Sequence, residues 1–239
     1  MTELLYLPDD DRTTEFVSQV TEARTEYIVL DGTYFYPEGG GQPPDHGTLS
    51  WDGGDATVMN VRKNHGDVRH YVESMTGDPP DEGTVVEGAV DSSRRERLSR
   101  MHTAQHVVSR VVLDEYGATT AGNQIHPDRS RIDFEPASFD EEDLETIQRL
   151  ANEAIERDYP VRKENRPRTV VEESVDEGRA LLDLIPASVD PLRVVEVEGF
   201  DTCPCGGTHV DRLGAIGRLE ITGRTTKGRD TERIEFELA

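Results

Sequence analysis

The 239-residue chain is long enough for one large domain or two small ones, and its 49 acidic against 26 basic residues give a formal net charge of −23. This acidity, with Lys63, Lys163 and Lys227 as the only lysines, is typical of a halophilic protein that works in concentrated salt; an ordinary acidic cytosolic protein is the alternative. There is no apolar run of about 18 residues, no charged-then-apolar leader, and only two cysteines, which lie close together, so we expect a cytoplasmic protein without a membrane span, secretory signal or disulfide framework.

The first ninety residues have the pattern of short strands separated by turns. Runs rich in β-forming residues alternate with Asp-Gly, Gly-Gly and Pro-Pro pairs, and no long helical period interrupts them. We therefore predict a small β-barrel domain over residues 1–91, with 76–83 as a hairpin loop. The expected strands cover residues 27–30, 56–61, 68–72 and 83–90.

A glycine-rich segment, residues 34–43, lies within the predicted barrel. Gly39, Gly40 and Gly41 permit a close approach of the backbone to a ligand, and Gln42 can both donate and accept hydrogen bonds. Prolines near both ends stiffen the segment. We predict a substrate-binding loop here, and a flexible turn between barrel strands is the alternative.

After residue 91 the pattern changes to that of a helix followed by alternating strands and helices. Ser92 or Ser93 can cap a helix that runs to about Tyr116, and Gly117 suits a left-handed C-cap. The elements that follow predict an α+β domain over residues 92–239, with helices packed on a mainly antiparallel sheet. We expect hairpins over 119–134 and 215–238, strands over 161–171 and 192–197, and helices over 140–157 and 172–182.

Two pairs of candidate metal ligands lie far apart in this second domain. His102 and His106 are four residues apart on the expected helix, so their imidazoles share one face. Cys205 and His209 have the same spacing in a glycine-rich segment, where a tight turn can bring the two side chains to one point. Because Zn²⁺ prefers tetrahedral ligation by His and Cys, we predict one Zn²⁺ per chain held by these four side chains.

The segments His102-Thr-Ala-Gln-His106 and Cys205-Gly-Gly-Thr-His209 together resemble the signature of alanyl-tRNA synthetase editing domains and of their free-standing relatives, the AlaX trans-editing proteins. Residues 34–43 are similar to the glycine-rich motif of the longer AlaX forms, and residues 150–153 resemble the helix between the two metal motifs. The resemblance covers nearly the whole chain. It implies the medium-length form, in which a β-barrel precedes the editing domain.

This resemblance implies an aminoacyl-tRNA deacylase, which hydrolyses the ester of mischarged alanine tRNA: Ser-tRNA(Ala) first, and Gly-tRNA(Ala) as a further substrate. The partner is then tRNA(Ala), and the sequence indicates no membrane or protein partner. A site that prefers serine needs a group to bind its hydroxyl, and the resemblance points to Thr120 or its neighbour Thr119; Thr103 is another candidate. The glycine-rich loop is expected beside the pocket. Ordinary structural roles are the alternative for each threonine, and the sequence identifies no catalytic base.

Two other functions stay open. Four protein ligands close a zinc tetrahedron, as in structural sites, so the chain is alternatively a zinc-containing tRNA-binding module without hydrolase activity. Editing of Thr-tRNA is the second, because the editing domain of threonyl-tRNA synthetase shares the histidine pair. Arg95 and Arg97, shortly before His102, are expected to contact tRNA phosphates, unless they pair with surrounding carboxylates. We assign no role to Cys203 or to the other four histidines.

Overall fold

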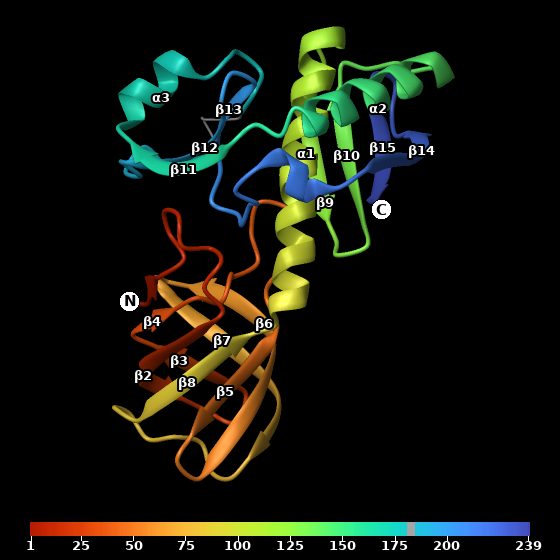
Figure 1. Ribbon diagram of the computed structural model, residues 1–239. Coiled ribbons are helices and arrows are strands. Elements are labelled where there is room, and N and C mark those ends of the chain that lie inside the picture. The colour runs from red at the N-terminus through yellow and green to blue at the C-terminus, as the bar shows by residue number, and fades with distance from the viewer. Residues whose placement is uncertain (181–184) are drawn as a thin grey trace. The chain divides into compact units, whose positions relative to one another are not determined.

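The computed structural model describes residues 1–180 and 185–239 (Figure 1). Contacts within the chain divide it into two compact units, Met1–Glu96 and Arg97–Ala239, and the division falls within helix α1 (Ser92–Tyr116). The expected domain boundary after residue 91 stays a prediction. Among the described residues, no helix combines the length and the apolar character that a membrane crossing requires.

The first unit is built on a closed antiparallel barrel with the strand order β2-β3-β7-β6-β5-β8 (Figure 1). Alternate residues of its strands are buried, as the strand β8 illustrates, because successive side chains point to opposite faces. Ile28, Leu30, Leu49 and Val58 are fully buried in the barrel core, so the predicted small β-barrel is confirmed. The strands of this unit are β1 (Glu3–Leu4), β2 (Glu15–Ala23), β3 (Tyr27–Leu30), β4 (Gly32–Thr33), β5 (Gly47–Trp51), β6 (Gly54–Asn64), β7 (Asp67–Thr76) and β8 (Val85–Val90).

The loop between β7 and β8 does not join a hairpin, so that part of the prediction is wrong. Strand β7 pairs with β3 and β6, whereas β8 pairs with β2 and β5. The two strands therefore belong to separate places in the barrel wall. Turn residues identify where a strand ends, but they do not identify the neighbour of that strand.

Helix α1 has the predicted length but a different N-cap. The carboxylate of Asp91 accepts a hydrogen bond from the backbone N–H of Arg94 (3.0 Å), so Asp91 caps the helix in place of Ser92 or Ser93. At the other end Gly117 has a φ of 65°, and its N–H donates to a carbonyl of the last helical turn. The left-handed glycine cap is confirmed.

Arg95 lies buried inside the first unit, so the prediction that it contacts tRNA phosphate is wrong. Only 3% of its surface is exposed, and its guanidinium pairs with the fully buried carboxylate of Asp45. It also donates to the carbonyl oxygens of Asp11 and Tyr34, both at 2.6 Å. Burial satisfied by an ion pair and two carbonyls gives Arg95 a structural role. Arg97 is exposed, and its contact with tRNA stays a prediction.

The second unit combines helices with two antiparallel sheets, which confirms the predicted α+β class (Figure 1). One sheet has the order β14-β15-β10-β9, the other β11-β12-β13. Helices α1 and α2 share one hydrophobic core with the strands of both sheets. Its elements after α1 are β9 (Thr119–Ile125), β10 (Arg129–Glu135), α2 (Glu141–Glu156), β11 (Val161–Arg166), α3 (Arg168–Ser174), β12 (Leu192–Val197), β13 (Asp201–Pro204), the 3₁₀-helix η2 (Leu213–Ile216), β14 (Leu219–Thr226) and β15 (Glu232–Leu238).

Between residues 161 and 182 the sequence prediction fails in two places. The expected strand over 161–171 ends at Arg166, and helix α3 occupies the rest. Pro167 marks the change, because it has no N–H for the sheet but is well tolerated at a helix N-terminus. The helix expected over 172–182 is correct only for 172–174, which form the end of α3, and is wrong for 175–180; its last two residues lie outside the described part of the chain.

Helix α2 begins at a capping box and is bonded to the edge of a sheet. Asp140 and Asp143 exchange side-chain-to-backbone hydrogen bonds at its start. Further along, the Asn152 side chain both accepts from the N–H of Leu219 (2.9 Å) and donates to its carbonyl (2.8 Å). The Gln148 side chain accepts from the N–H of Ile221 on the same strand (2.7 Å). The outer edge of β14 is thus paired with a helix.

Candidate functional site

Three histidines and one cysteine meet in the second unit. One donor atom from each of His102, His106, Cys205 and His209 lies within 4.8 Å of the others. The His209 ring centroid is 4.4 Å from that of His102 and 4.7 Å from that of His106. The Cys205 Sγ lies 3.5 Å from His102 Nε2 and 3.3 Å from His209 Nε2. The four residues that the sequence singles out are positioned to bind one metal ion.

Local structure brings each pair together as the spacing predicts. His102 and His106 are separated by one turn of α1, and both are almost completely buried. Cys205 follows β13, and the chain turns back so that the N–H of Gly207 donates to the Cys205 Sγ (3.4 Å). Hydrogen bonds of this kind stabilise a thiolate and hold it in place.

The donor set fits a zinc ion. With Zn–S of about 2.3 Å and Zn–N of about 2.0 Å, ligands at a tetrahedral angle place sulfur and nitrogen about 3.5 Å apart. The two measured separations from the Cys205 Sγ, 3.5 and 3.3 Å, are close to this value. Three imidazoles and a thiol are also the ligand types that zinc prefers. The cluster therefore has the composition and the spacing of a zinc site.

Electrostatics keep the three imidazoles neutral. Burial lowers the pKa of His102, His106 and His209 well below the usual value, and the positive charge of Arg193 lowers it further for all three. A neutral imidazole has a lone pair for a metal, whereas a protonated one has none. At neutral pH the rings are ready to act as ligands.

Thr103 fixes the orientation of the His209 ring. Its hydroxyl donates to the carbonyl of Ser99 (2.8 Å), so its oxygen is left to accept from the N–H of Val210 (3.2 Å). The same oxygen lies 3.2 Å from His209 Nδ1, which must therefore carry the proton and donate. His209 Nε2 is then the atom with the lone pair, and it is the atom that faces Cys205. Whether Thr103 also contacts a substrate stays a prediction.

Arg193 holds the loop that contains Cys205, and sequence reasoning missed it. It lies on β12 with 9% of its surface exposed, and one of its nitrogens donates to the carbonyls of Cys205 (2.7 Å) and Gly207 (2.8 Å). The backbone carbonyl of Arg193 also accepts from the N–H of Cys205 (3.1 Å). An arginine within the apolar run 192–197 was the available signal, because a buried arginine needs several acceptors.

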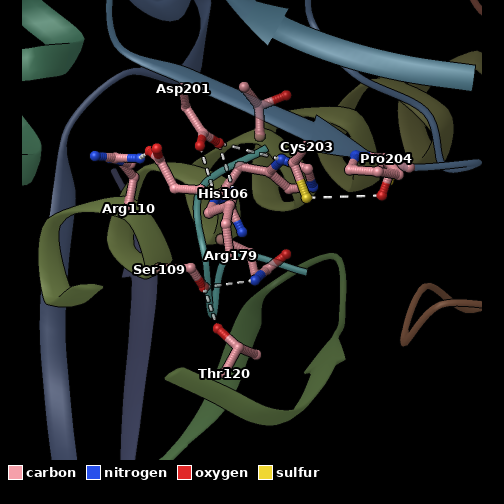
Figure 2. Close-up of polar contacts among 12 residues, drawn as sticks. His106, Ser109, Arg110, Thr120, Arg179, Asp201, Cys203 and Pro204 are labelled. Atoms are coloured by element: carbon pink, nitrogen blue, oxygen red, sulfur yellow. Dashed lines mark hydrogen bonds and ion pairs between the residues drawn. The ribbon is translucent and has the colours of Figure 1, made fainter. Parts of the chain in front are cut away.

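Two more residues beside the site, Asp201 and Arg179, were not expected from the sequence. Asp201 precedes the cysteine loop on β13, and one of its oxygens lies 3.8 Å from His106 Nδ1 (Figure 2). Arg179 comes from an irregular segment and pairs with Asp201 (Figure 2). The sequence contains no local signal that links them, because the pairing is purely tertiary.

The candidate Thr120 reaches the turn of α1 that follows His106. Its hydroxyl lies 2.8 Å from the hydroxyl of Ser109, which in turn accepts from the side-chain amide of Gln105 (2.8 Å) (Figure 2). Thr119 instead donates to the carbonyl of Glu135 across the hairpin (2.9 Å). Of the two threonines, Thr120 is therefore the one connected to the histidine-bearing helix.

The glycine-rich segment belongs to the first unit, where it forms a tight turn. Gly39 and Gln42 exchange two backbone hydrogen bonds, of 3.2 and 2.9 Å. Gly40 and Gly41 have φ values of 57° and 83°, which place both in the left-handed region that favours glycine. Gln42 is buried, and Gly40 is exposed at the tip. Substrate binding by these four residues stays a prediction.

Cys203 is not part of the donor cluster. It is buried on β13, and its thiol donates weakly to the carbonyl of Pro204 (3.6 Å) (Figure 2). Burial raises its pKa to about 12, so it remains a protonated thiol at neutral pH. A protonated thiol is a poor metal ligand, which separates Cys203 from its neighbour Cys205.

Two protein-family models match the chain. Residues 5–94 match class II (A) tRNA synthetases, and residues 192–235 match the second additional domain of threonyl and alanyl tRNA synthetases. The second match includes Cys205 and His209. Both units therefore contain sequence typical of tRNA synthetases.

Individual relatives match over the full chain. Alanyl-tRNA editing protein AlaX-M of Methanosarcina acetivorans is 37% identical over 100% of this chain and 99% of its own length. The protein of the same name from Methanosarcina mazei is 38% identical over 100% of this chain and 97% of its own. Alanine–tRNA ligase of Methanopyrus kandleri is 41% identical over 98% of this chain, which spans only 26% of that ligase.

Proposed function

The chain belongs to the AlaX-M family of alanyl-tRNA editing proteins, and on that premise we propose that it hydrolyses the ester bond of mischarged tRNA(Ala). Serine is the proposed amino acid of its main substrate and glycine that of a second. The observation that carries the proposal is the convergence of His102, His106, Cys205 and His209 on one point, in a chain that matches editing proteins from end to end.

The four clustered residues would hold Zn²⁺, and the other residues around them serve that cluster. When bound, zinc supplies a Lewis acid that can polarise an ester carbonyl or lower the pKa of water. Thr103 holds the His209 tautomer, and Arg193 holds the loop that presents Cys205. Burial excludes bulk water from the histidines. No residue is assigned as the catalytic base.

Selectivity for serine requires a partner for the serine hydroxyl. A site built to hydrogen-bond that hydroxyl discriminates strongly against alanine, which lacks it. Thr120 supports this role best among the described candidates, because its hydroxyl joins the Gln105–Ser109 chain on the histidine-bearing helix. Gly39, Gly40, Gly41 and Gln42 are proposed as further substrate contacts on the resemblance alone.

A binding module without hydrolase activity is the second candidate. The observation in its favour is that four protein ligands fill a tetrahedron and leave no open position, as in structural zinc sites. Editing of Thr-tRNA is a third, because the family model matched at residues 192–235 includes threonyl tRNA synthetases. The binding module would hold a charged tRNA without releasing its amino acid, and the threonyl editing enzyme would release threonine.

Incubation with charged tRNA separates these functions. The protein is added to tRNA(Ala) charged with serine, glycine or alanine and to tRNA(Thr) charged with threonine, and release of the amino acid is followed. Since the chain is strongly acidic, we propose that it works in concentrated salt and would assay it at about 1 M KCl, where the Debye length is about 3 Å. We expect serine to be released at least about 100-fold faster than alanine.

The two neighbouring cysteines provide a matched control. Cys205→Ser should abolish the release of serine, whereas Cys203→Ser should leave it close to the parent rate, because only Cys205 belongs to the donor cluster. Tight tRNA binding without release of any amino acid would favour the binding module. Release of threonine faster than serine would favour the threonyl branch.

A further inference from the structure

His106 differs from His209 in the hydrogen bonding of its Nδ1. The Nδ1 of His209 donates to Thr103, and the thiol of Cys205 accepts from Gly207. His106 Nδ1 is buried and has no hydrogen-bond partner within reach. The carboxylate of Asp201 is close by, with its Oδ2 3.8 Å from this nitrogen. A buried ring nitrogen without a hydrogen bond lowers the stability of the fold unless a nearby group can bond to it.

Asp201 is placed by a buried arginine. The Nε of Arg179 donates to one carboxylate oxygen (2.6 Å) and its Nη2 to the other (2.5 Å), which is a two-pronged contact of fixed geometry (Figure 2). The side chains of Arg179 and Asp201 are only 4% and 1% exposed. A buried ion pair seldom stabilises a fold more than apolar side chains of the same volume would. Its presence here therefore calls for a reason other than stability.

The segment that delivers Arg179 is fastened to the histidine-bearing helix and its neighbour. Asp176 forms an ion pair with Arg110 of α1. Gly178, with a φ of 81°, lies so close to Thr119 that an added Cβ would come within 2.7 Å of the threonine methyl. These contacts flank Arg179 on its N-terminal side and hold an otherwise irregular segment against α1 and β9.

We propose that Asp201, held in place by Arg179, is the positioning residue for the metal ligand His106. A shift of about 1 Å from the present 3.8 Å separation brings the carboxylate within hydrogen-bond distance of the Nδ1 proton of His106. Nε2 is then left to bind the metal, and the ring is fixed in the ligand orientation. This inference rests on the proposed metal-dependent function and adds two residues to it. A carboxylate behind a metal-binding imidazole is a common arrangement, and its loss weakens metal binding about 10- to 100-fold.

Metal affinity tests the proposal directly. Zn²⁺ dissociation constants would be measured for the full chain by competition with a chromophoric chelator, and visible spectra recorded for the Co²⁺-substituted protein. Asp201→Asn should weaken Zn²⁺ binding about 10- to 100-fold and shift the Co²⁺ bands, because the ring is no longer held by a charge. Arg179→Gln should produce a smaller loss in the same direction. Urea unfolding of the metal-free proteins reports the separate effect on stability.

The Asp133–Arg233 pair gives a matched control in the same unit. It has the same two-pronged geometry, at 2.6 and 2.8 Å, and neither residue belongs to the cluster of four donors. Asp133→Asn should lower stability and leave the Zn²⁺ affinity within about threefold of the parent. If Asp201→Asn does not fold, the double variant Asp201→Leu with Arg179→Met replaces the buried pair by apolar side chains and removes the same acceptor.

The outcomes separate this proposal from the proposed function. A folded Asp201→Asn or double variant with the parent affinity and the parent Co²⁺ spectrum would overturn the role of Asp201. A parent protein that binds no stoichiometric zinc would overturn both that role and the zinc centre. A parent that binds zinc but releases no amino acid from any charged tRNA would reject the deacylase alone, and a weakened affinity in Asp201→Asn would still support Asp201 as the positioning residue.

Discussion

His70 in the barrel and His106 in the second unit are both buried histidines, but only one has both ring nitrogens bonded. His70 Nδ1 donates to the carbonyl of Ile28 (2.9 Å), and its Nε2 accepts from the hydroxyl of Thr33 (2.8 Å). His106 has an unbonded Nδ1 and shares its surroundings with three other donors. Burial lowers the pKa of both. Burial and a low pKa thus do not identify a functional histidine, whereas the partners of its nitrogens do.

The largest expected effect is the loss of a ligand. His106→Ala should weaken Zn²⁺ binding by more than about 100-fold, beyond the effect of any supporting residue, and abolish release of serine from Ser-tRNA(Ala). His70→Gln should keep one zinc per chain and the parent activity, although it weakens the barrel. Elemental analysis of the purified proteins measures the zinc content. An equal zinc content in His106→Ala and in the parent would mean that His106, like His70, is not a metal ligand.

Acid should destabilise the barrel through His70. The pKa of His70 is lowered to about 4 by burial, against an ordinary value of about 6.5 in the unfolded chain. Between these values the unfolded state binds the proton and the folded state does not, so stability falls as the pH drops. From pH 7.5 to pH 5 the loss should be about 2 kcal/mol.

Urea unfolding of the parent and of His70→Gln at the two pH values measures this contribution. The other titrating groups are common to both proteins, so the parent should lose about 2 kcal/mol more than the variant. The same pH dependence in both proteins would mean that His70 is not the group responsible.

Thr103 extends the comparison of histidine partners to His209. Its hydroxyl can hold the His209 ring, or it can contact a substrate. Thr103→Val keeps the shape but removes the acceptor for His209 Nδ1 and the Val210 N–H. We expect about 10-fold weaker Zn²⁺ binding and an unchanged serine-to-alanine rate ratio. Thr2→Val in the first unit is the control and should keep the parent zinc affinity, since Thr2 likewise donates to a carbonyl, that of Leu30 (2.8 Å), and accepts from a backbone N–H, that of Val68 (3.0 Å). A changed rate ratio with parental zinc affinity would make Thr103 a substrate contact instead.

The smallest expected effect concerns the glycine-rich turn of the first unit. Gly40→Leu and Gly53→Leu both place a side chain on a residue with positive φ and open space around it, so each should cost about 1–2 kcal/mol of stability. Only Gly40→Leu should change the relative rates for serine, glycine and alanine, by a few-fold. Rates that do not differ between the two variants would leave the first unit without a part in selectivity.

The metal donors could be predicted from the sequence because each pair is local. Spacing of four residues on a helix, or across a tight turn, fixes which side chains meet without knowledge of the rest of the fold. Gly117 and the period of α1 were readable for the same reason. That the two pairs then converge was inferred from the shared ligand chemistry and from the family resemblance.

The pairing of Arg179 with Asp201 beside the donors could not be predicted, because the two partners are distant in the sequence. Arg179 meets Asp201 across 22 positions, and Arg95 meets Asp45 across 50. An arginine that looks solvated in the sequence can therefore be buried in an ion pair, which is why Arg95 was misjudged. Likewise the valines at 170 and 171 favour a strand locally, but Pro167 and the packing of Val171 in a small core with β12 give a helix.

The side chains that helix α2 sends to β14 have a consequence for the behaviour of the protein in crowded solution. An open strand edge exposes backbone donors and acceptors, which is the route by which folded proteins add strands from other copies and form aggregates. At the start of β14, Asn152 occupies the N–H and carbonyl of Leu219, and Gln148 occupies the N–H of Ile221, as a neighbouring strand would. Two amide side chains thus leave these backbone groups unavailable to a strand from another copy, independently of the chemistry at the histidines.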